Sequence, residues 1–253
     1  MTLRLERDGA VARLLIDRPA RRNAMNQAMW RQFPQLVGDA MADEATRVLI
    51  LASAAPGLFC AGADIDEFAA CTGDEAWRIA NQAAIRASQY ALARAEKPVI
   101  AAIDGDCVGG GCGLAIACDL RIAAPDARLG ITPAKLGIVY SLFDTKLLVD
   151  LVGPARARRI LYTGALHRAD EALAIGLIDE VAPDPLAAAD ALARTIAANA
   201  QHSVRAAKAI VRRILDGQAD DDATTLALFR DAFTLPDFAE GVAAFRDKRR
   251  PDF

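Results

Sequence analysis

Residues 107–113 read CVGGGCG, and this stretch decides the fold because three consecutive glycines join an apolar strand to an apolar helix. The strand pattern is VIAAIDGDCV (99–108), and the helix pattern is CGLAIACD (112–119). Glycine allows close backbone approach, and the start of a helix leaves N–H groups without partners. We therefore predict a site whose backbone N–H groups hold an anion or a developing oxyanion. A tight turn or close strand packing would explain the glycines alone equally well.

The composition is typical of a soluble globular protein and excludes several classes of function. The chain has 253 residues, of which 53% are hydrophobic and 25% charged, and a formal net charge of -3 gives no basic surface for nucleic acid. No apolar run approaches the roughly 20 residues that a membrane span needs, so we expect no membrane partner. Five cysteines without CxxC pairs predict reduced thiols, a cytoplasmic location and no metal site.

The order of the patterns predicts an α/β core that carries helices at its C-terminal end. LRLERDGAVARLLID (3–17) reads as a hairpin that turns at Asp8-Gly9, and a helix is expected after start signals at Pro19 and Asn23. TRVLILASA (46–54) is typical of a buried parallel strand, and residues 74–97 form an amphipathic helical pattern. Another strand is expected at 120–130, and the chain reads as mainly helical after about residue 144.

A second loop of small residues follows the strand at 46–54. GLFCAGADIDEF (57–68) places Asp64 at the start of a helix, where it is most simply an N-cap. Two strand ends that lead into free N–H groups can hold one carbonyl oxygen from two sides. Other glycine-rich sites fit less well, because GxxxxGK[ST] and GxSxG are absent and Leu114 stands where the last glycine of GxGxxG would be. An NAD-dependent enzyme is therefore disfavoured.

Here the chain resembles the crotonase, or enoyl-CoA hydratase/isomerase, superfamily. The motifs that carry the resemblance are DRPARRNAMN (17–26), FCAGADIDEF (59–68), residues 97–123 around the glycines, ARLGITPAKLGI (127–138) and the ending FRDKRRPDF (245–253). The resemblance implies a crotonase (ClpP-like) α/β fold of repeated ββα units. It further implies an acyl-CoA core at 1–190 and a C-terminal helical trimerisation region at 191–253, with a homotrimer or a dimer of trimers as the assembly.

The resemblance also implies acyl-CoA thioester substrates, with coenzyme A carried by the substrate and no other cofactor. The family's oxyanion hole maps onto the backbone N–H groups of Ala63 and Gly110. Arg22 and Lys248 are candidates for the CoA phosphates, although each is explained equally well as a solvated surface cation. The other candidate substrate or CoA contacts are Cys60, Ala61, Asp64, Ile65, Gly109, Gly113, Pro133 and Ser141.

The sequence departs from the family's hydratases at both of their catalytic glutamates. Hydratases carry one glutamate directly after GGGC, where this chain has Gly113. The second lies in a segment that matches GITPAKLG (130–137), and its position falls on Pro133. Neither residue can transfer a proton, so hydration by the usual pair is in doubt. The glycine also leaves space for a bulkier acyl group or for water.

Polar residues that could replace the pair follow Gly137. Decarboxylase-like members of the family place a tyrosine where TPAKLGIVY (132–140) has Tyr140, and others use an aspartate near the position of Ser141. Tyr140 could orient a carboxylate or a leaving group, and Asp144 could act as acid or base if buried. Alternatively, Tyr140 only packs and Asp144 caps the following helix. Asp66 and Glu67 are weaker candidates.

We therefore expect an acyl-CoA enzyme, with a role in fatty acid metabolism, that stabilises a thioester enolate in a backbone oxyanion hole. Because both glutamates are replaced, the leading hypothesis is a non-standard lyase or isomerase. A conventional enoyl-CoA hydratase/isomerase is the first alternative. A catalytically silent acyl-CoA-binding protein is the second.

Overall fold

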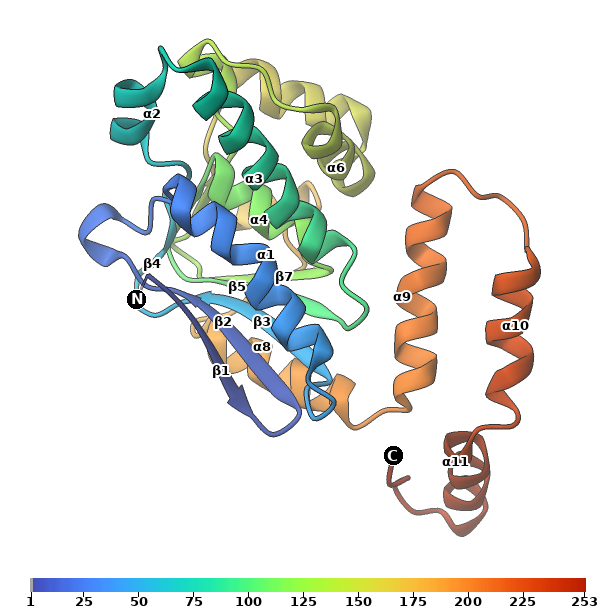
Figure 1. The fold of residues 1–253 in the computed structure, drawn as a ribbon. Helices are drawn as coiled ribbons and strands as arrows, with labels where there is room; N and C mark the ends of the chain where they lie inside the picture. Colours follow the sequence, from blue (N-terminus) through green and yellow to red (C-terminus); the bar gives the residue numbers. More distant parts are fainter. Residues whose placement is uncertain (1) are drawn as a thin grey trace.

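A computed structural model describes residues 2–253, whose strands form two sheets (Figure 1). The large sheet has the order β1 (Leu3–Asp8), β2 (Val11–Ile16), β3 (Val48–Ser53), β5 (Val99–Ile103), β7 (Leu120–Ala123) and β10 (Glu180–Val181). The small sheet has the order β4 (Leu58–Cys60), β6 (Asp106–Val108), β8 (Arg128–Gly130) and β9 (His167–Arg168). Only the pairs β1–β2 and β8–β9 are antiparallel within the described sheets.

The chain builds both sheets by repeating one unit of two strands and a helical segment. In β3–β4, β5–β6 and β7–β8 the first strand joins the large sheet and the second joins the small sheet. The helices that follow these pairs are α2 (Ile65–Cys71) with α3 (Glu75–Ala93), then α4 (Gly110–Ala117), then α5 (Pro133–Leu136) with α6 (Leu142–Thr163). This is the arrangement of repeated ββα units that the resemblance to the crotonase superfamily implies.

The large sheet is covered on both faces, as its parallel strands require. Leu49 and Leu51 of β3 belong to the apolar core formed with α1 (Gln27–Ala42), α3 and α4. Val48 and Ile50 of the same strand belong to a second core, which α8 (Pro185–Ala197) completes with its alanine face. Figure 1 shows α1, α3 and α4 above the sheet and α8 below it.

The C-terminal helices leave the core only after α8. The predicted boundary at 190/191 falls inside α8, which packs against the sheet along its whole length, so the separate helical region begins after Ala197. Helices α9 (Gln201–Leu215), α10 (Ala223–Ala232) and α11 (Pro236–Asp247) then extend to one side of the core (Figure 1). Lys208 of α9 is anchored to the core by Asp119, at 2.7 Å, and by the carbonyl of Lys97.

Local details differ from the sequence-based expectations. The hairpin turns at Gly9-Ala10, because Asp8 is still paired with Val11. Asn23 does not begin a helix. Its φ is +55°, next to +52° at Arg22, and its buried side-chain amide donates a hydrogen bond to the carbonyl of Phe59. Asn26 caps α1 instead.

Two predicted long strands are each divided between the sheets. Residues 99–108 form β5 and β6, and residues 120–130 form β7 and β8. The break in the first lies at Gly105, whose φ is +88°. Within residues 2–253, no helix combines the length and the apolar character needed to cross a membrane.

Candidate active site

The backbone N–H groups of Ala63 and Gly110 lie side by side, where two neighbouring parallel strands of the small sheet end. Ala63 follows β4, and Gly110 opens α4 after β6. A Cβ built on Gly110 would lie 3.6 Å from Ala63 N, and one on Gly62 would lie 3.2 Å from Gly110 N. Neither N–H donates a hydrogen bond to another group among residues 2–253. The predicted pair of donors is therefore adjacent and free to bind a ligand oxygen.

The loop that carries Ala63 is held by the buried carboxylate of Asp64. This carboxylate accepts a hydrogen bond from Arg18 at 2.7 Å and caps α2 through the N–H of Glu67. Burial opposes ionisation, but Arg18, the N–H of Glu67 and the charge of Arg21 together outweigh it and keep the pKa of Asp64 below its usual value. Met25 adds a short bridge, donating to the carbonyl of Gly62 and accepting from the N–H of Asp64. Asp64 thus has a structural role, as the N-cap interpretation expects.

The loop that carries Gly110 needs glycine for its backbone conformation at one position and for space at the next two. Gly109 caps α4 with a φ of +55°, which favours glycine. A Cβ on Gly110 would lie 3.1 Å from the indole of Trp30, and one on Gly111 would overlap the carbonyl of Cys60. The glycine run therefore serves close packing and a free amide at the same time.

Some of the predicted CoA contacts are accessible to a ligand, and others are buried or already paired. Ile65 is 53% exposed beside the first loop, and Ala61 is half-buried there. Arg22 is exposed, yet it pairs with Asp106 at 2.5 Å. Cys60 is fully buried, its thiol bonds the carbonyl of Asn23, and burial raises its pKa to about 12, so only its backbone is available.

Lys248 is the one candidate that the structure does not bring to this region. It is exposed at the C-cap of α11. In Figure 1, α11 lies on the opposite side of the molecule from α2 and the start of α4. A contact between Lys248 and CoA bound at Ala63 would therefore need a second chain.

Gly113 lies one helical turn after Gly110 and leaves space that two polar side chains fill. A Cβ at this position would overlap Nε2 of Gln89 and lie 2.8 Å from Oη of Tyr140. Residues three apart on a helix share a face. The space next to the two amides is therefore lined by an amide and a phenol.

Tyr140, which is partly buried, and Asp144, which is buried, lie near each other at the start of α6. Ser141 is the N-cap of this helix, so the alternative interpretation of Asp144 as its N-cap is wrong. Asp144 is 7% exposed, and burial raises its pKa against the opposing hydrogen bonds of Ser141. Burial, together with the nearby Asp144 charge, raises the pKa of Tyr140 well above its usual value. Pro133 begins α5 and is buried.

Sequence reasoning missed two residues of this region, Gln89 and Arg18. Gln89 is 1% exposed and both atoms of its amide lack a hydrogen-bond partner in residues 2–253. Its signal was its place in the helix pattern at 74–97, because Asn81, Ile85 and Gln89 recur every four residues on the face that also buries Ser88 and Leu92. A large polar residue on the buried face of an amphipathic helix is a candidate for function. Arg18 has no comparable signal.

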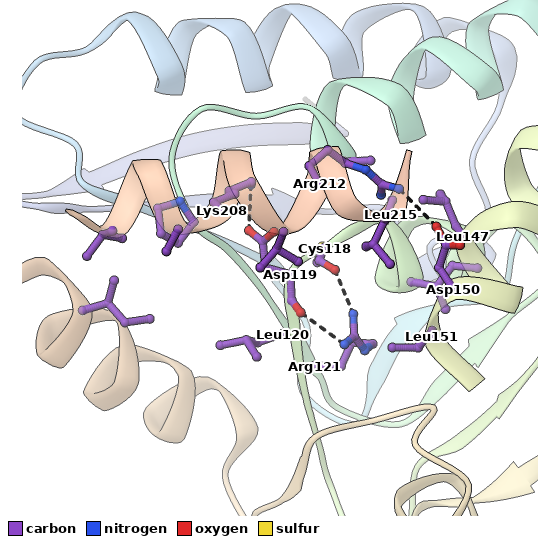
Figure 2. A pocket seen from close by; sticks show the side chains of 18 of the residues that line it. Cys118, Asp119, Leu120, Arg121, Leu147, Asp150, Leu151, Lys208, Arg212 and Leu215 are labelled. Carbon is purple, nitrogen blue, oxygen red and sulfur yellow. Dashed lines mark hydrogen bonds and ion pairs between the residues drawn. The ribbon is translucent and has the colours of Figure 1, made fainter. Parts of the chain in front are cut away.

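A separate cavity of about 510 Å³ lies between α9 and the core (Figure 2). Figure 2 shows Lys208 reaching Asp119 and Arg212 reaching Asp150 across it, and both pairs are within 3.1 Å. None of the predicted site residues lines this cavity. Its charges are already paired, so it is a packing feature of the C-terminal helices and not the predicted site. Among residues 2–253 no cluster of histidine, cysteine, aspartate or glutamate could hold a metal ion.

Comparisons with known proteins agree with the fold. The family model described as enoyl-CoA hydratase/isomerase matches residues 6–253. The chain is 35% identical to the short-chain-enoyl-CoA hydratase of Clostridium acetobutylicum, over 97% of this chain and 95% of that protein. It is 36% identical to the crotonyl-CoA hydratase of Syntrophomonas wolfei, over 98% of this chain and 96% of that protein.

A solved structure of an enoyl-CoA hydratase/isomerase family protein from Hyphomonas neptunium superposes with a TM-score of 0.96 and 41% identity, covering 100% of this chain and 97% of the other. The two-sheet array of ββα units thus defines a crotonase-fold protein. The chain belongs to the enoyl-CoA hydratase/isomerase family, a family of enzymes that act on acyl-CoA thioesters.

Proposed function

We propose that the chain binds an acyl-CoA thioester with its carbonyl oxygen between the N–H groups of Ala63 and Gly110. The observation that carries the proposal is the adjacency of these two amides, neither of which has a partner among residues 2–253. As a carbanion forms at C2 of the acyl group, its charge moves to this oxygen, and each fixed donor lowers the barrier by about 3 kcal/mol. Coenzyme A arrives with the substrate, and no other cofactor takes part.

Proton transfer is assigned to Asp144, with Tyr140 as a hydrogen-bond donor. Residues 113 and 133 offer no carboxylate, whereas Asp144 is buried and has a raised pKa, as suits a general acid or base. Asp144 takes the proton from C2 as the enolate forms. Delivery of this proton to C4 completes a double-bond migration. Delivery of the proton to a leaving group at C3 completes an elimination. Tyr140 stays protonated and orients the reacting group, so the protein is a non-standard lyase or isomerase.

The remaining contacts and the assembly belong to the same proposal. Ala61 and Ile65 contact the CoA chain, while Arg22 and a Lys248 from a neighbouring subunit meet its phosphates. Large exposed apolar side chains on α9–α11 support a homotrimer or a dimer of trimers as the working form. All five cysteines are free thiols, which supports a cytoplasmic location.

A conventional enoyl-CoA hydratase is the second candidate, because relatives at 35% and 36% identity carry that name. It would require water to be activated by Asp144 or Tyr140 in place of the glutamate pair. Crotonyl-CoA hydration that survives both Tyr140→Phe and Asp144→Asn would rule out these roles.

The test is incubation of the purified protein with enoyl-, malonyl- and branched acyl-CoA thioesters in deuterated water, read by mass spectrometry. Deuterium at C2, or a product, is the expected result, and the product mass identifies the reaction. Loss of methylmalonyl-CoA turnover in Tyr140→Phe would point to decarboxylation. Binding of every thioester without exchange or product would overturn the enzyme proposal in favour of a silent acyl-CoA-binding protein.

A further inference from the structure

Three side chains with buried polar atoms, here called the polar cluster, meet beside the proposed thioester site: Gln89 of α3, the partly buried Tyr140 of the α5–α6 loop, and Asp144 of α6. Gln89 is 1% exposed and Asp144 is 7% exposed. Nε2 and Oε1 of Gln89, Oη of Tyr140 and Oδ1 of Asp144 are buried and have no partner among residues 2–253. Proteins rarely bury polar atoms without partners, because each such atom destabilises the fold. These four unpaired atoms together are therefore a candidate binding site.

The polar cluster lies where the acyl group would extend if the amides of Ala63 and Gly110 hold the thioester oxygen. Gly113 follows Gly110 by three residues in α4, which is about 4.5 Å along the helix axis and on the same face. The cluster begins where a side chain at Gly113 would otherwise lie, since its Cβ would overlap Gln89 Nε2 and sit 2.8 Å from Tyr140 Oη. An acyl group whose carbonyl is held by the Gly110 amide would extend toward these atoms.

The chemistry of the polar cluster favours one kind of substituent. Gln89 offers donors and an acceptor, Tyr140 a donor, and Asp144 an acceptor. A hydrocarbon would leave all of these unpaired. A carboxylate would be buried beside Asp144. The charge of Arg86 acts on Asp144, but its guanidinium is stacked over the rings of Tyr90 and Phe143 and donates no hydrogen bond within the cluster, so it does not pair with a second carboxylate. A hydroxyl both donates and accepts, so it matches the cluster without a buried charge.

We propose that the polar cluster selects acyl groups that carry a neutral hydroxyl, and that Gln89 is the residue that determines this specificity. The inference rests on the proposed acyl-CoA function and adds the class of acyl group. Gly113 is then explained as the residue that admits the Gln89 amide to the acyl site.

The test measures dissociation constants by calorimetry for two pairs of thioesters matched in size. In each pair a hydroxyl replaces a methyl: 3-hydroxybutyryl-CoA against 3-methylbutyryl-CoA, and 4-hydroxybutyryl-CoA against pentanoyl-CoA. Mass spectrometry of the same samples records any conversion. We expect at least one hydroxylated member to bind about tenfold more tightly than its partner. Succinyl-CoA is expected to bind more weakly than 4-hydroxybutyryl-CoA.

Variants then assign the preference to Gln89. Gln89→Met keeps the side-chain volume and removes the amide, so the preference should fall to within about threefold while binding of the methyl member stays unchanged. Gly113→Ala should displace the Gln89 amide and reduce the same preference. Gly38→Ala is the matched control, since it also adds a methyl to a helix but has no atom within 4 Å of the new Cβ.

The outcomes separate this inference from the function on which it rests. If no thioester binds, the proposed acyl-CoA function fails. If both members of each pair bind equally, or if the preference survives Gln89→Met and Gly113→Ala in folded protein, the specificity of the polar cluster is refuted while the acyl-CoA function stands.

Discussion

At Gly110 the absent side chain keeps two groups close to the same point: an added Cβ would lie 3.1 Å from Cζ2 of Trp30 and 3.6 Å from the amide nitrogen of Ala63. We predict that Gly110→Ala folds but shifts the start of α4 away from the indole, and so misplaces one oxyanion donor. Deuterium exchange at C2 of a bound acyl-CoA should slow roughly 10- to 100-fold.

Gly38→Ala serves as the control for this change. Gly38 is exposed inside α1, and a Cβ there would meet nothing within 4 Å. Its exchange rate should equal that of the wild type, and its stability should rise by up to about 1 kcal/mol. A folded Gly110→Ala protein with wild-type exchange would show that the oxyanion lies elsewhere.

At Asp144 we predict opposite effects on stability and on catalysis. Burial raises the pKa of this carboxyl in the folded protein, so the folded state holds its proton more tightly than the unfolded chain does. Stability is therefore lost as pH rises from the unfolded value of about 3.9 through the raised pKa. Asp144→Asn removes that loss, so the variant should melt at a higher temperature than the wild type at pH 7. The difference between the two melting temperatures should shrink toward pH 4.

The same substitution should slow C2 exchange by about 10²- to 10⁴-fold if Asp144 moves the proton. In the wild type, the rate of C2 proton removal should fall as pH drops through the raised pKa, because the protonated carboxyl cannot accept a proton. Thermal melts and exchange rates across pH 4–8 check both parts. An Asp144→Asn protein that is less stable at pH 7 and equally active would contradict the assignment.

At the scale of elements, the joint between β4 and α2 depends on one buried ion pair. Arg18 donates to Asp64 at 2.7 Å and to the carbonyl of Ala24, and Asp64 is 6% exposed. Arg18→Ala leaves this carboxylate buried without its cation, so the free energy of unfolding should fall by about 3 kcal/mol at pH 7. Because the pKa of Asp64 is lowered in the fold, the ion pair contributes fully above the unfolded pKa of about 3.9, and the difference between the two proteins should shrink as pH falls through the lowered pKa.

Arg21→Ala is the natural comparison, because Arg21 pairs with Asp66 at 2.8 Å on the surface of the same joint. Exposed pairs contribute little, and the unfolding free energy should change by less than about 1 kcal/mol. Urea unfolding of both variants at pH 7 and pH 3.5 makes the measurement. Equal effects of the two substitutions would mean that the buried pair does not hold the loop.

The same scale shows what the sequence could predict. Apolar periodicity located β3, β5, α3 and α4, because buried parallel strands and amphipathic helices have regular patterns. Periodicity alone did not divide 99–108 between two sheets, although Asp104-Gly105-Asp106 interrupts the apolar run there, because both strands are short and a turn signal does not say which sheet the next strand joins. Nor could it decide between Asn23 and Asn26 as the cap of α1, because both residue types suit a cap and only tertiary contacts of Asn23 with Phe59 exclude it.

The candidate site also contains residues that the sequence could predict and one that it could not. The two loops with free N–H groups could be predicted from their small residues, and the resemblance to the crotonase superfamily then pointed to Ala63 and Gly110. Gln89 could not be placed there, because its helix packs against α4 through contacts between residues distant in sequence. The overlap of its amide with the space at Gly113 exists only in three dimensions.

At the scale of the whole molecule, α10 and α11 present an aromatic surface to solvent in the single chain. Phe229, Phe233 and Phe238 stack edge to face with centroids 5.4 and 5.2 Å apart, and they are 70%, 53% and 46% exposed. Phe245 on α11 is 86% exposed. Apolar surface of this kind is covered in most stable proteins, and Figure 1 shows α10 and α11 standing apart from the two-sheet core.

We therefore predict that the wild type elutes at three or six times the mass of one chain in size-exclusion chromatography with light scattering. Phe245→Asp should move this mass toward one chain, because a carboxylate cannot be buried in an apolar contact without a cation. Ile79→Asp places the same charge at a 64% exposed apolar position on α3 and should leave the mass unchanged. If the wild type is already a monomer at micromolar concentration, the aromatic surface is not a contact between subunits, and Lys248 then has no route to CoA bound at Ala63.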